Sequence, residues 1–374
     1  MDKAGIGQLL RQLVAIDGPS GVEALVASLV ADLARDVATE TRVDALGNVI
    51  ALRRGAANPP GRILLAAHMD EIGLIVTRVE DSFLHVHEVG GLDPRALLGQ
   101  EVTVYPTGPR TGQTFEVSET LKVFMDGKGL PGYIGGRPPH LTAAENRDRV
   151  IPLGDLRVDL GLPRAILESG LVQVGDRVAV RGPYTELLGG RVVSKALDNR
   201  ASVAAMLGAL GYLAAMQHSW DVYAVATVQE EIGLRGAITS AFEIAPDVAI
   251  AIDVTFGATP GLNNAETVAM DKGPAIGWGP NLHPGVVSAL RKAADAHEIP
   301  YVVEPLPGDS GTDAWAIQVA REGIPTGLTS IPIRYMHSAT ELVVLADIDR
   351  TARLLATFIG RLDDAFLASL PEEV

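Results

Sequence analysis

The 374-residue sequence predicts an α/β protein in which a mixed sheet is sandwiched by helices and a small β-barrel-like domain is inserted into the chain. Two observations lead to this fold class. Helical patterns alternate with buried-strand patterns in residues 1–73 and again in residues 184–374. Between them, residues 74–183 contain short β-type runs broken by glycine and proline. Because strands that alternate with helices are covered on both faces, we expect the two outer segments to form one domain around the insertion.

The first outer segment predicts a helix followed by strands. Ser20 and Glu23 have the spacing of a capping box, and leucines recur at helical spacing over 25–33. The run "ETRVDALGNVIALRRG" (40–55) predicts a hairpin, and "RILLAAHMDEIGLIV" (62–76) predicts a buried strand.

The insertion has a different character. Long helical patterns are scarce in it, apart from a brief one at 163–170. Its β-type runs lie at 82–89, 101–108, 121–127, 155–161 and 176–184. This pattern is typical of a small β domain.

The second outer segment returns to alternating helices and strands. Helices are predicted at 199–216, 284–297 and 347–370. Strands are predicted at 220–228, 248–253 and 326–333.

Composition narrows the kinds of function. The sequence has no cysteine, which excludes disulfides and thiolate chemistry and leaves His, Asp and Glu as metal ligands. A net charge of −15 would repel nucleic acid and anionic membranes. The N-terminus lacks the apolar region of a signal peptide, and no apolar stretch reaches transmembrane length, so we expect a soluble cytoplasmic protein.

Polar side chains that can do chemistry follow five of the strand-like runs. In open α/β sheets, ligands gather beyond the carboxyl ends of the strands, so these side chains are expected to meet at one edge of the sheet. In chain order, they are His68 and Asp70, Asp198, Glu230 and Glu231, Asp253, and His337.

Two histidines and three carboxylates suit a pair of divalent transition metals, with zinc, cobalt or manganese favoured by the imidazoles. Asp70 lies two residues after His68 and could orient that ring by accepting its hydrogen bond. Glu230 and Glu231 are adjacent, so their side chains point in different directions. One of them can bind a metal while the other serves as a general base.

The motifs together resemble the M42 family of dinuclear metalloaminopeptidases, which includes glutamyl, deblocking and tetrahedral (TET) aminopeptidases. The resemblance rests on "AAHMDEIG", "SKALDNR", "VQEEIGLRGA", "AIDV" and "IPIRYMHS", in that order and at that spacing. It implies an enzyme that hydrolyses N-terminal residues from peptides. It also implies an α/β peptidase domain and a smaller β domain used in assembly, with homo-oligomers from dimers to dodecamers.

The resemblance also assigns roles to residues. Glu230 would act as general base on a metal-bridging water, and Asp70 would orient His68. The implied metal ligands are His68 and Asp253 for one ion, Glu231 and His337 for the other, and Asp198 as the bridge. The ions would be zinc or cobalt, with manganese also compatible.

Other functions remain to be weighed. Some relatives carry an endoglucanase label, but glycoside hydrolysis normally uses two carboxylates without metals. A metal-dependent deacylase could use the same ligands, whereas a non-enzymatic scaffold need not retain a full set. In "PGDSGTDAWA" (307–316), Thr312 or Asp313 can cap a helix or line a substrate cleft, and the sequence weighs these alternatives equally.

Overall fold

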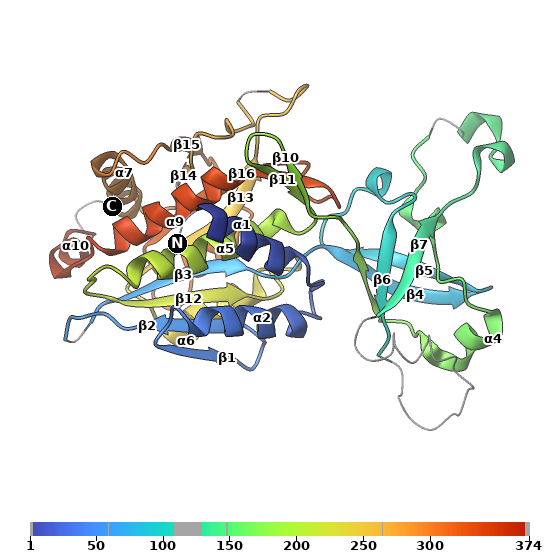
Figure 1. Cartoon of the computed structure of the whole chain (residues 1–374), viewed down its shortest axis with the longest axis horizontal. Coiled ribbons are helices and arrows are strands. Elements are labelled where there is room, and N and C mark those ends of the chain that lie inside the picture. The colour runs from blue at the N-terminus through green and yellow to red at the C-terminus, as the bar shows by residue number, and fades with distance from the viewer. Residues whose placement is uncertain (1–2, 59, 108–128, 147–148, 264, 371–374) are drawn as a thin grey trace. The chain divides into compact units, whose positions relative to one another are not determined.

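The structure is a computed structural model that describes residues 3–58, 60–107, 129–146, 149–263 and 265–370 (Figure 1). The chain forms two compact units. The first contains residues 1–71, 184–336 and 340–374, and the second contains residues 72–183 and 337–339.

The first unit is built on one large mixed sheet. Among the described residues it has 11 strands, nine of them in the order β1-β2-β12-β3-β13-β16-β17-β11-β10; β14 pairs with β16, and β15 pairs with β14. The bounds are β1 (Glu40–Val43), β2 (Val49–Arg53), β3 (Arg62–His68), β10 (Thr185–Leu187), β11 (Arg191–Ser194), β12 (Asp221–Thr227), β13 (Val248–Phe256), β14 (Ala275–Trp278), β15 (Val302–Pro305), β16 (Thr326–Arg334) and β17 (Glu341–Val344).

The centre of this sheet is parallel. Strand β3 pairs in parallel with β12 and β13, and β13 pairs in parallel with β16. The register places Thr227 beside His68 and Asp253 beside Ser330. The carboxyl ends of four neighbouring strands therefore meet at one edge, where the sequence places most of its chemical side chains.

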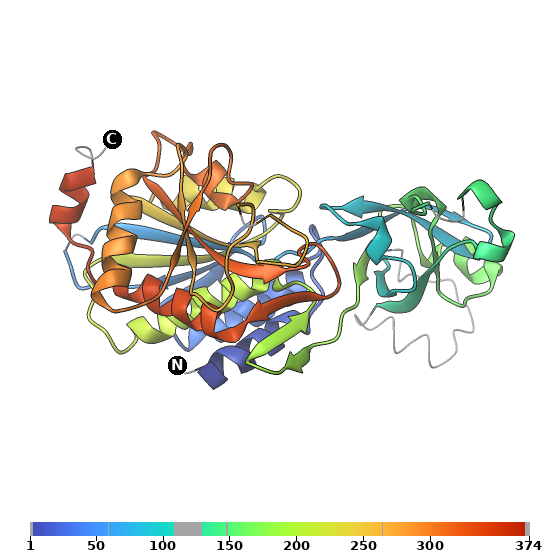
Figure 2. The same cartoon turned by 90° about the horizontal axis from the view of Figure 1, so that it is seen from above.

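Helices cover both faces of the sheet. Their bounds are α1 (Lys3–Val14), α2 (Ala24–Arg35), α5 (Leu197–Leu213), α6 (Arg235–Ile244), α7 (Pro284–Ala296), α8 (Asp313–Ile317), α9 (Leu345–Ile359) and α10 (Asp364–Ser369). Figure 1 shows α1, α5 and α9 together over the sheet, and Figure 2 shows the strands between helices on both sides.

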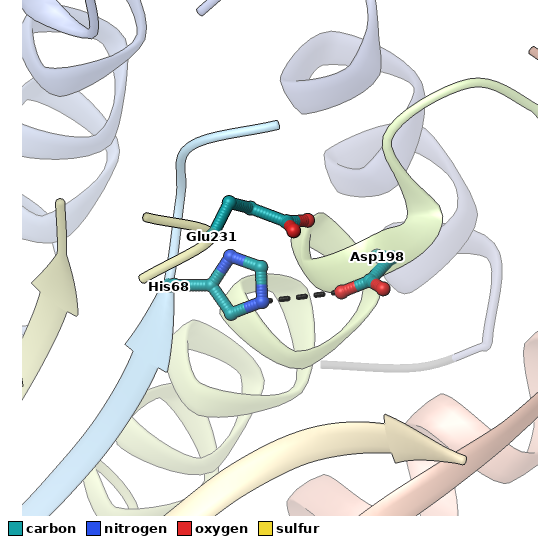
Figure 3. A group of neighbouring side chains, drawn as sticks. All are labelled: His68, Asp198 and Glu231. Carbon is teal, nitrogen blue, oxygen red and sulfur yellow. Dashed lines mark ion pairs between the residues drawn. The ribbon is translucent and has the colours of Figure 1, made fainter. Parts of the chain in front are cut away.

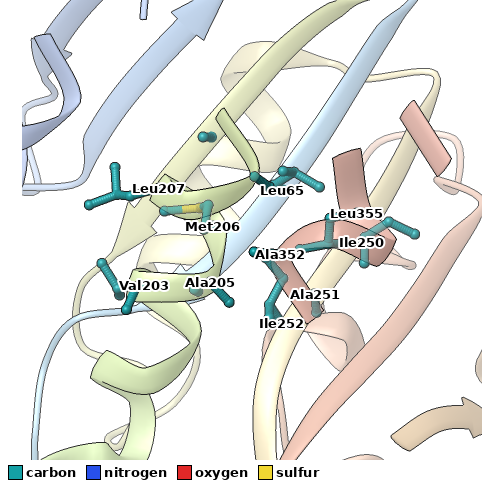
Figure 4. Packing of buried hydrophobic residues seen from close by; sticks show 14 of the residues in the cluster. Leu65, Val203, Ala205, Met206, Leu207, Ile250, Ala251, Ile252, Ala352 and Leu355 are labelled. Carbon is teal, nitrogen blue, oxygen red and sulfur yellow. The ribbon is translucent and has the colours of Figure 1, made fainter. Parts of the chain in front are cut away.

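Side chains of β3 alternate between the two faces, as the period of a strand requires. Leu65 and the residues two positions to either side of it on β3, Ile63 and Ala67, pack with α5 and α9 in the large core cluster. Part of this cluster is drawn in Figure 4. Leu64 and Ala66 pack instead with α6 and α8. His68 continues this second series, so its imidazole belongs to the face that carries α6 and α8.

The second unit is a small closed barrel with its own apolar core. Its strands follow the order β4-β5-β8-β7-β6-β9 around the barrel. Their bounds are β4 (Gly73–Glu80), β5 (Phe83–Val89), β6 (Glu101–Tyr105), β7 (Leu130–Gly135), β8 (Arg157–Asp159) and β9 (Arg177–Val180). Short helical turns occupy Pro94–Ala96, Pro139–Leu141, Ala144–Asn146, Leu153–Asp155, Arg164–Ile166 (α4) and Leu167–Leu171.

The predicted fold class is confirmed, with a mixed sheet between helices and a closed barrel of six strands. The predicted hairpin is β1 paired with β2 around Asp44, whose carboxylate accepts three backbone hydrogen bonds. The strand predicted at 121–127 lies outside the described residues. No helix in the part of the chain that the structure describes is long and apolar enough to cross a membrane.

Three local predictions are wrong. The run 62–76, predicted as one strand, forms β3 of the first unit and β4 of the second, and the chain leaves the sheet between them after His68. The segment 347–370 forms two helices rather than one, because the Asp363 carboxylate accepts a hydrogen bond from the Phe366 amide and starts α10 anew. The capping box is also absent. Ser20 donates its hydroxyl hydrogen bond to Asp70 instead, and Glu23 accepts one from the amide of Gly21.

Candidate metal centre

Six candidate residues of the first unit gather beyond the carboxyl edge of the sheet. His68 is the last residue of β3, and Asp253 lies within β13. Glu230 and Glu231 follow β12, and Asp198 stands in the first turn of α5. Asp70, two residues beyond β3, joins the same cluster through its hydrogen bonds. Segments separated by up to 185 positions therefore supply one cluster, as the strand-end pattern predicts.

His68 lies at the centre of this cluster. Its Nε2 atom is 3.1 Å from Oδ1 of Asp198, as drawn in Figure 3. The same atom is 3.8 Å from Oε2 of Glu230 and 3.8 Å from Oδ1 of Asp253. Two overlapping groups offer ligand atoms within 4.8 Å of one another: His68 with Asp198 and Glu231, and His68 with Glu230 and Asp253.

Asp70 organises the cluster in more ways than the sequence indicates. Its Oδ1 atom lies 3.5 Å from Nδ1 of His68, and the backbone carbonyl oxygen of Asp70 lies nearer to that atom, at 3.3 Å, so the orienting role of the carboxylate stays a prediction. The same carboxylate accepts hydrogen bonds from the amides of Glu230 at 3.0 Å and Glu231 at 3.3 Å. Ser20 donates a further hydrogen bond of 2.6 Å. The Asp70 carboxylate thus holds the backbone amides of both glutamates.

Two acidic residues that the sequence analysis did not assign also belong here. Asp313 is almost fully buried, and its Oδ2 accepts a 2.6 Å hydrogen bond from Thr227, the residue beside His68 in the sheet. Thr312, not Asp313, caps α8. Glu341, at the start of β17, accepts a 3.0 Å hydrogen bond from the amide of Asp198. The Gly-Thr-Asp turn was a signal for Asp313, whereas no sequence pattern marked Glu341.

His337 stands apart from this description. It belongs to the second unit, where its Nδ1 atom is 2.8 Å from the carbonyl oxygen of Gly91. Neither group of ligand atoms found among the described residues includes it. Its assignment as a ligand therefore stays a prediction.

Burial makes the carboxylates resist ionisation. It raises the pKa of Glu230 to about 10 and the pKa of Asp253 to about 8, and nearby carboxylates add to both shifts while His68 opposes them. Burial likewise raises the pKa of Glu231 well above its usual range and that of Asp313 to about 6. Burial alone would lower the pKa of His68, but Glu230, foremost among the surrounding carboxylates, raises it well above normal.

Negative charge is in excess at this cluster. The acidic residues that surround His68 are Asp70, Asp198, Glu230, Glu231, Asp253, Asp313 and Glu341. Two cations close to Asp198 in the chain pair elsewhere: Lys195 and Arg200 both face Glu71, and Lys195 also contacts Asp17. Oδ1 of Asp313 is buried without a hydrogen-bond partner in the described part of the chain. A buried set of oxygen and imidazole donors with surplus negative charge fits divalent cations.

We expect the metal-free protein to lose stability as the pH rises. The folded chain holds protons on Glu230 and Asp253 up to about pH 10 and about pH 8, whereas the unfolded chain releases them near pH 4. Across this window the unfolded state binds fewer protons, so the free energy of unfolding falls with increasing pH. In a chelator, differential scanning fluorimetry should show Tm falling by about 3 °C or more between pH 6 and pH 9.

Bound divalent cations should remove most of that fall, because they replace the protons on these carboxylates. Equal pH dependence of Tm with and without added metal would contradict a metal centre at this cluster.

Comparisons with known proteins agree with the family resemblance of the sequence motifs. Residues 47–354 match the sequence profile of the M42 glutamyl aminopeptidase family. The chain is 36% identical over 362 residues to a lysyl aminopeptidase of Pyrococcus furiosus. The aligned region covers 95% of this chain and 97% of that protein.

Solved structures are similar over nearly the whole chain. An aminopeptidase of the archaeon Desulfurococcus kamchatkensis, APDkam598, has a TM-score of 0.87 and 37% identity over 98% of both chains. The TET1 peptidase of Pyrococcus horikoshii has a TM-score of 0.79 and 30% identity over 96% of this chain and 100% of that one. That peptidase can assemble into a tetrahedron or a large octahedral shell.

Proposed function

This chain belongs to the M42 family of glutamyl aminopeptidases and is a peptidase of the aminopeptidase class, and on that premise we propose that it is a two-metal enzyme with Glu230 as its general base. Its substrates are the free N-termini of peptides, and its place of action is the cytoplasm. The observation that carries the proposal is the gathering of buried carboxylates around the imidazole of His68.

The proposed ligands keep the roles that the family resemblance implies. They are His68 and Asp253 for one ion, Glu231 and His337 for the other, and Asp198 for both. Zinc or cobalt suits this set best, and manganese is also compatible. Once bound, such ions supply a water molecule of lowered pKa and polarise the carbonyl of the scissile bond.

Glu230 is the residue that moves the proton. Its buried carboxylate has a raised pKa, so once ionised it is a strong base for the proton of the attacking water. The same carboxyl group then returns the proton to the leaving amine. Asp70 holds the Glu230 amide at 3.0 Å, which keeps the base in position through both transfers.

The test is turnover of aminoacyl chromogenic substrates by metal-stripped protein, with zinc, cobalt and manganese each added back. We expect no turnover in the chelator and recovery with at least one of these ions. Substrates with a free amine should be cleaved, and their N-acetylated counterparts should not.

Each competing function gives a different result in this test. Cleavage of acetylated substrates would indicate a deacylase, and hydrolysis of a β-glucan in the chelator would indicate a glycosidase. Full aminopeptidase activity without metal would contradict the proposed chemistry.

We also propose that the chain forms homo-oligomers and that the barrel of the second unit contributes to their assembly. Support comes from the P. horikoshii TET1 peptidase, which can assemble into a tetrahedron or a large octahedral shell and matches 96% of this chain. Light scattering after size-exclusion chromatography should give a mass of at least twice the 39.3 kDa of one chain. A mass of one chain at micromolar concentration would contradict assembly.

A further inference from the structure

Glu341 is a buried carboxylate that binds the backbone of a proposed metal ligand. It is the first residue of β17 and is 1% exposed. Its Oε2 atom accepts a 3.0 Å hydrogen bond from the amide of Asp198, which lies 143 positions away in the chain. Strand β17 pairs with β11 in a register that sets Glu341 opposite Ser194, and α5 begins shortly after Ser194. The sheet therefore brings this carboxylate to the start of α5, within the first unit.

The amide of Asp198 needs an acceptor from outside its helix. The first amides of a helix have no hydrogen-bond partner within it, and Asp198 is the second residue of α5. The backbone angles of Asp198, φ −77° and ψ 102°, are not those of a helix, so helix formation by itself does not fix this residue. An acceptor on β17 fixes the direction of its N–H group. Through the adjoining Cα atom, it also fixes the direction in which the carboxylate leaves the backbone.

Other contacts hold the neighbours of Asp198 but act at different positions. Nδ2 of Asn199 donates a 2.9 Å hydrogen bond to a backbone carbonyl oxygen of β13. Nε of Arg200 donates a 3.0 Å hydrogen bond to the carbonyl oxygen of Met69, just beyond β3. These bonds hold the start of α5 against the sheet, whereas the Glu341 bond acts on the peptide of the ligand residue itself.

The Asp198 carboxylate has to be placed accurately. Its Oδ1 atom lies 3.1 Å from Nε2 of His68, and these two residues and Glu231 offer ligand atoms within 4.8 Å of one another. The groups of a functional site have to be held within about 0.5 Å of their productive geometry. A turn of the Asp198 peptide would carry its carboxylate beyond that tolerance, because the side chain moves with the backbone that bears it.

We propose that Glu341 is a positioning residue of the metal centre and that its hydrogen bond to the amide of Asp198 holds the Asp198 carboxylate where both ions can bind it. The proposal rests on the two-metal function put forward above. Removing a hydrogen bond that supports a metal ligand weakens metal binding by about 10- to 100-fold. We expect the effect on both ions, since Asp198 is the proposed ligand of both.

A direct effect of the Glu341 charge on the ions makes a different prediction. Burial is the main cause of the raised pKa of Glu231, and Glu341 is among the carboxylates that add to it, so the charge of Glu341 reaches the cluster. Glutamine at position 341 keeps an acceptor for the Asp198 amide but lacks the charge. It therefore separates the hydrogen bond from the charge.

A purely structural role makes a third prediction. If Glu341 only stabilised the first turn of α5, its loss would lower Tm and leave the metal affinity of the folded protein unchanged. Metal affinity, measured well below the Tm of each protein, therefore separates a positioning role from a structural one.

The experiment titrates Co²⁺ into metal-stripped wild-type protein, Glu341→Gln and Glu341→Met. Isothermal titration calorimetry gives the affinity, and visible absorption reports the coordination of the ion. Methionine is close to glutamate in size but offers no oxygen to the Asp198 amide. We expect Kd for Co²⁺ to rise by about tenfold or more in Glu341→Met, with an altered absorption spectrum. In Glu341→Gln, both the affinity and the spectrum should stay close to those of the wild type.

Asp363→Leu is the matched control. The Asp363 carboxylate accepts a 2.8 Å hydrogen bond from the amide of Phe366 at the start of α10, so this variant loses the same kind of contact at a helix that carries no proposed ligand. It should lower Tm in a chelator and leave Co²⁺ binding unchanged.

Two results would overturn the role of Glu341. One is equal Co²⁺ affinity in the wild type and Glu341→Met. The other is an equal loss of affinity in Glu341→Gln and Glu341→Met, because the charge and not the hydrogen bond would then act on the ions. If Glu341→Met did not fold, Glu341→Asp would decide, since it keeps the charge but withdraws the acceptor from the Asp198 amide. Weaker Co²⁺ binding in Glu341→Asp would support the proposal, and wild-type affinity would overturn it.

Peptidase activity separates this proposal from the aminopeptidase function. A wild-type chain that bound Co²⁺, lost affinity in Glu341→Met and cleaved no peptide substrate would refute the proposed function and leave the role of Glu341 in place. Metal-dependent peptidase activity with equal Co²⁺ affinity in all variants would refute the role of Glu341 alone. A wild-type chain that bound no Co²⁺ would overturn both.

Discussion

Replacing Glu230 by glutamine should lower kcat by about 10²- to 10⁴-fold while leaving metal content close to that of the wild type. Glutamine fills nearly the same space and can still donate and accept hydrogen bonds, but it cannot take a proton from water. The amide of residue 230 would keep its hydrogen bond to Asp70, because that bond belongs to the backbone. The loss should therefore appear in kcat rather than in KM.

The neighbouring residue provides the matched control. Glu231→Gln is the same chemical change one position along, at a residue proposed as a metal ligand. It should lose metal, measured by inductively coupled plasma mass spectrometry after dialysis, together with activity. Near-normal turnover in Glu230→Gln would show that Glu230 is not the base. Loss of metal in that variant would instead make Glu230 a ligand, as its grouping with His68 and Asp253 would allow.

Replacing Asp198 by asparagine should abolish measurable metal binding and lower activity by about 10³-fold or more. Asp198 is buried, and its Oδ1 lies 3.1 Å from His68 Nε2. Its carboxylate is therefore in the cluster where both proposed ions would bind. Without that charge, the remaining donors hold two divalent ions poorly. Metal content and kcat/KM should therefore fall together.

The same variant should not destabilise the metal-free protein. It removes one negative charge from a buried excess of carboxylates, so the Tm of Asp198→Asn in a chelator should equal or exceed that of the wild type. The backbone amide of residue 198 can still donate to Glu341. Asp295→Asn, at an exposed position, should change neither Tm nor metal content. A large fall in Tm together with retained metal would indicate a structural role for Asp198.

The sequence by itself determined the fold class and most of the candidate site. Buried runs such as 62–68 and 248–256 carry the strong apolar signal of central parallel strands, and they did form β3 and β13. Parallel strands end at the same edge, so the residues that follow them had to meet, as His68, Asp253 and the two glutamates do. The types of those residues then indicated metal chemistry.

Only the tertiary structure could decide which partner each polar side chain of the site contacts. Ser20 has the spacing of a helix cap but bonds Asp70, because a contact 50 positions away outweighs a local one. Glu341 lies on an element without a distinctive local pattern, and its hydrogen bond to the amide of Asp198 is what makes it part of the site. Periodicity in a sequence reports which face of a strand or helix is buried, whereas the partner of a buried polar group depends on the packing of distant segments.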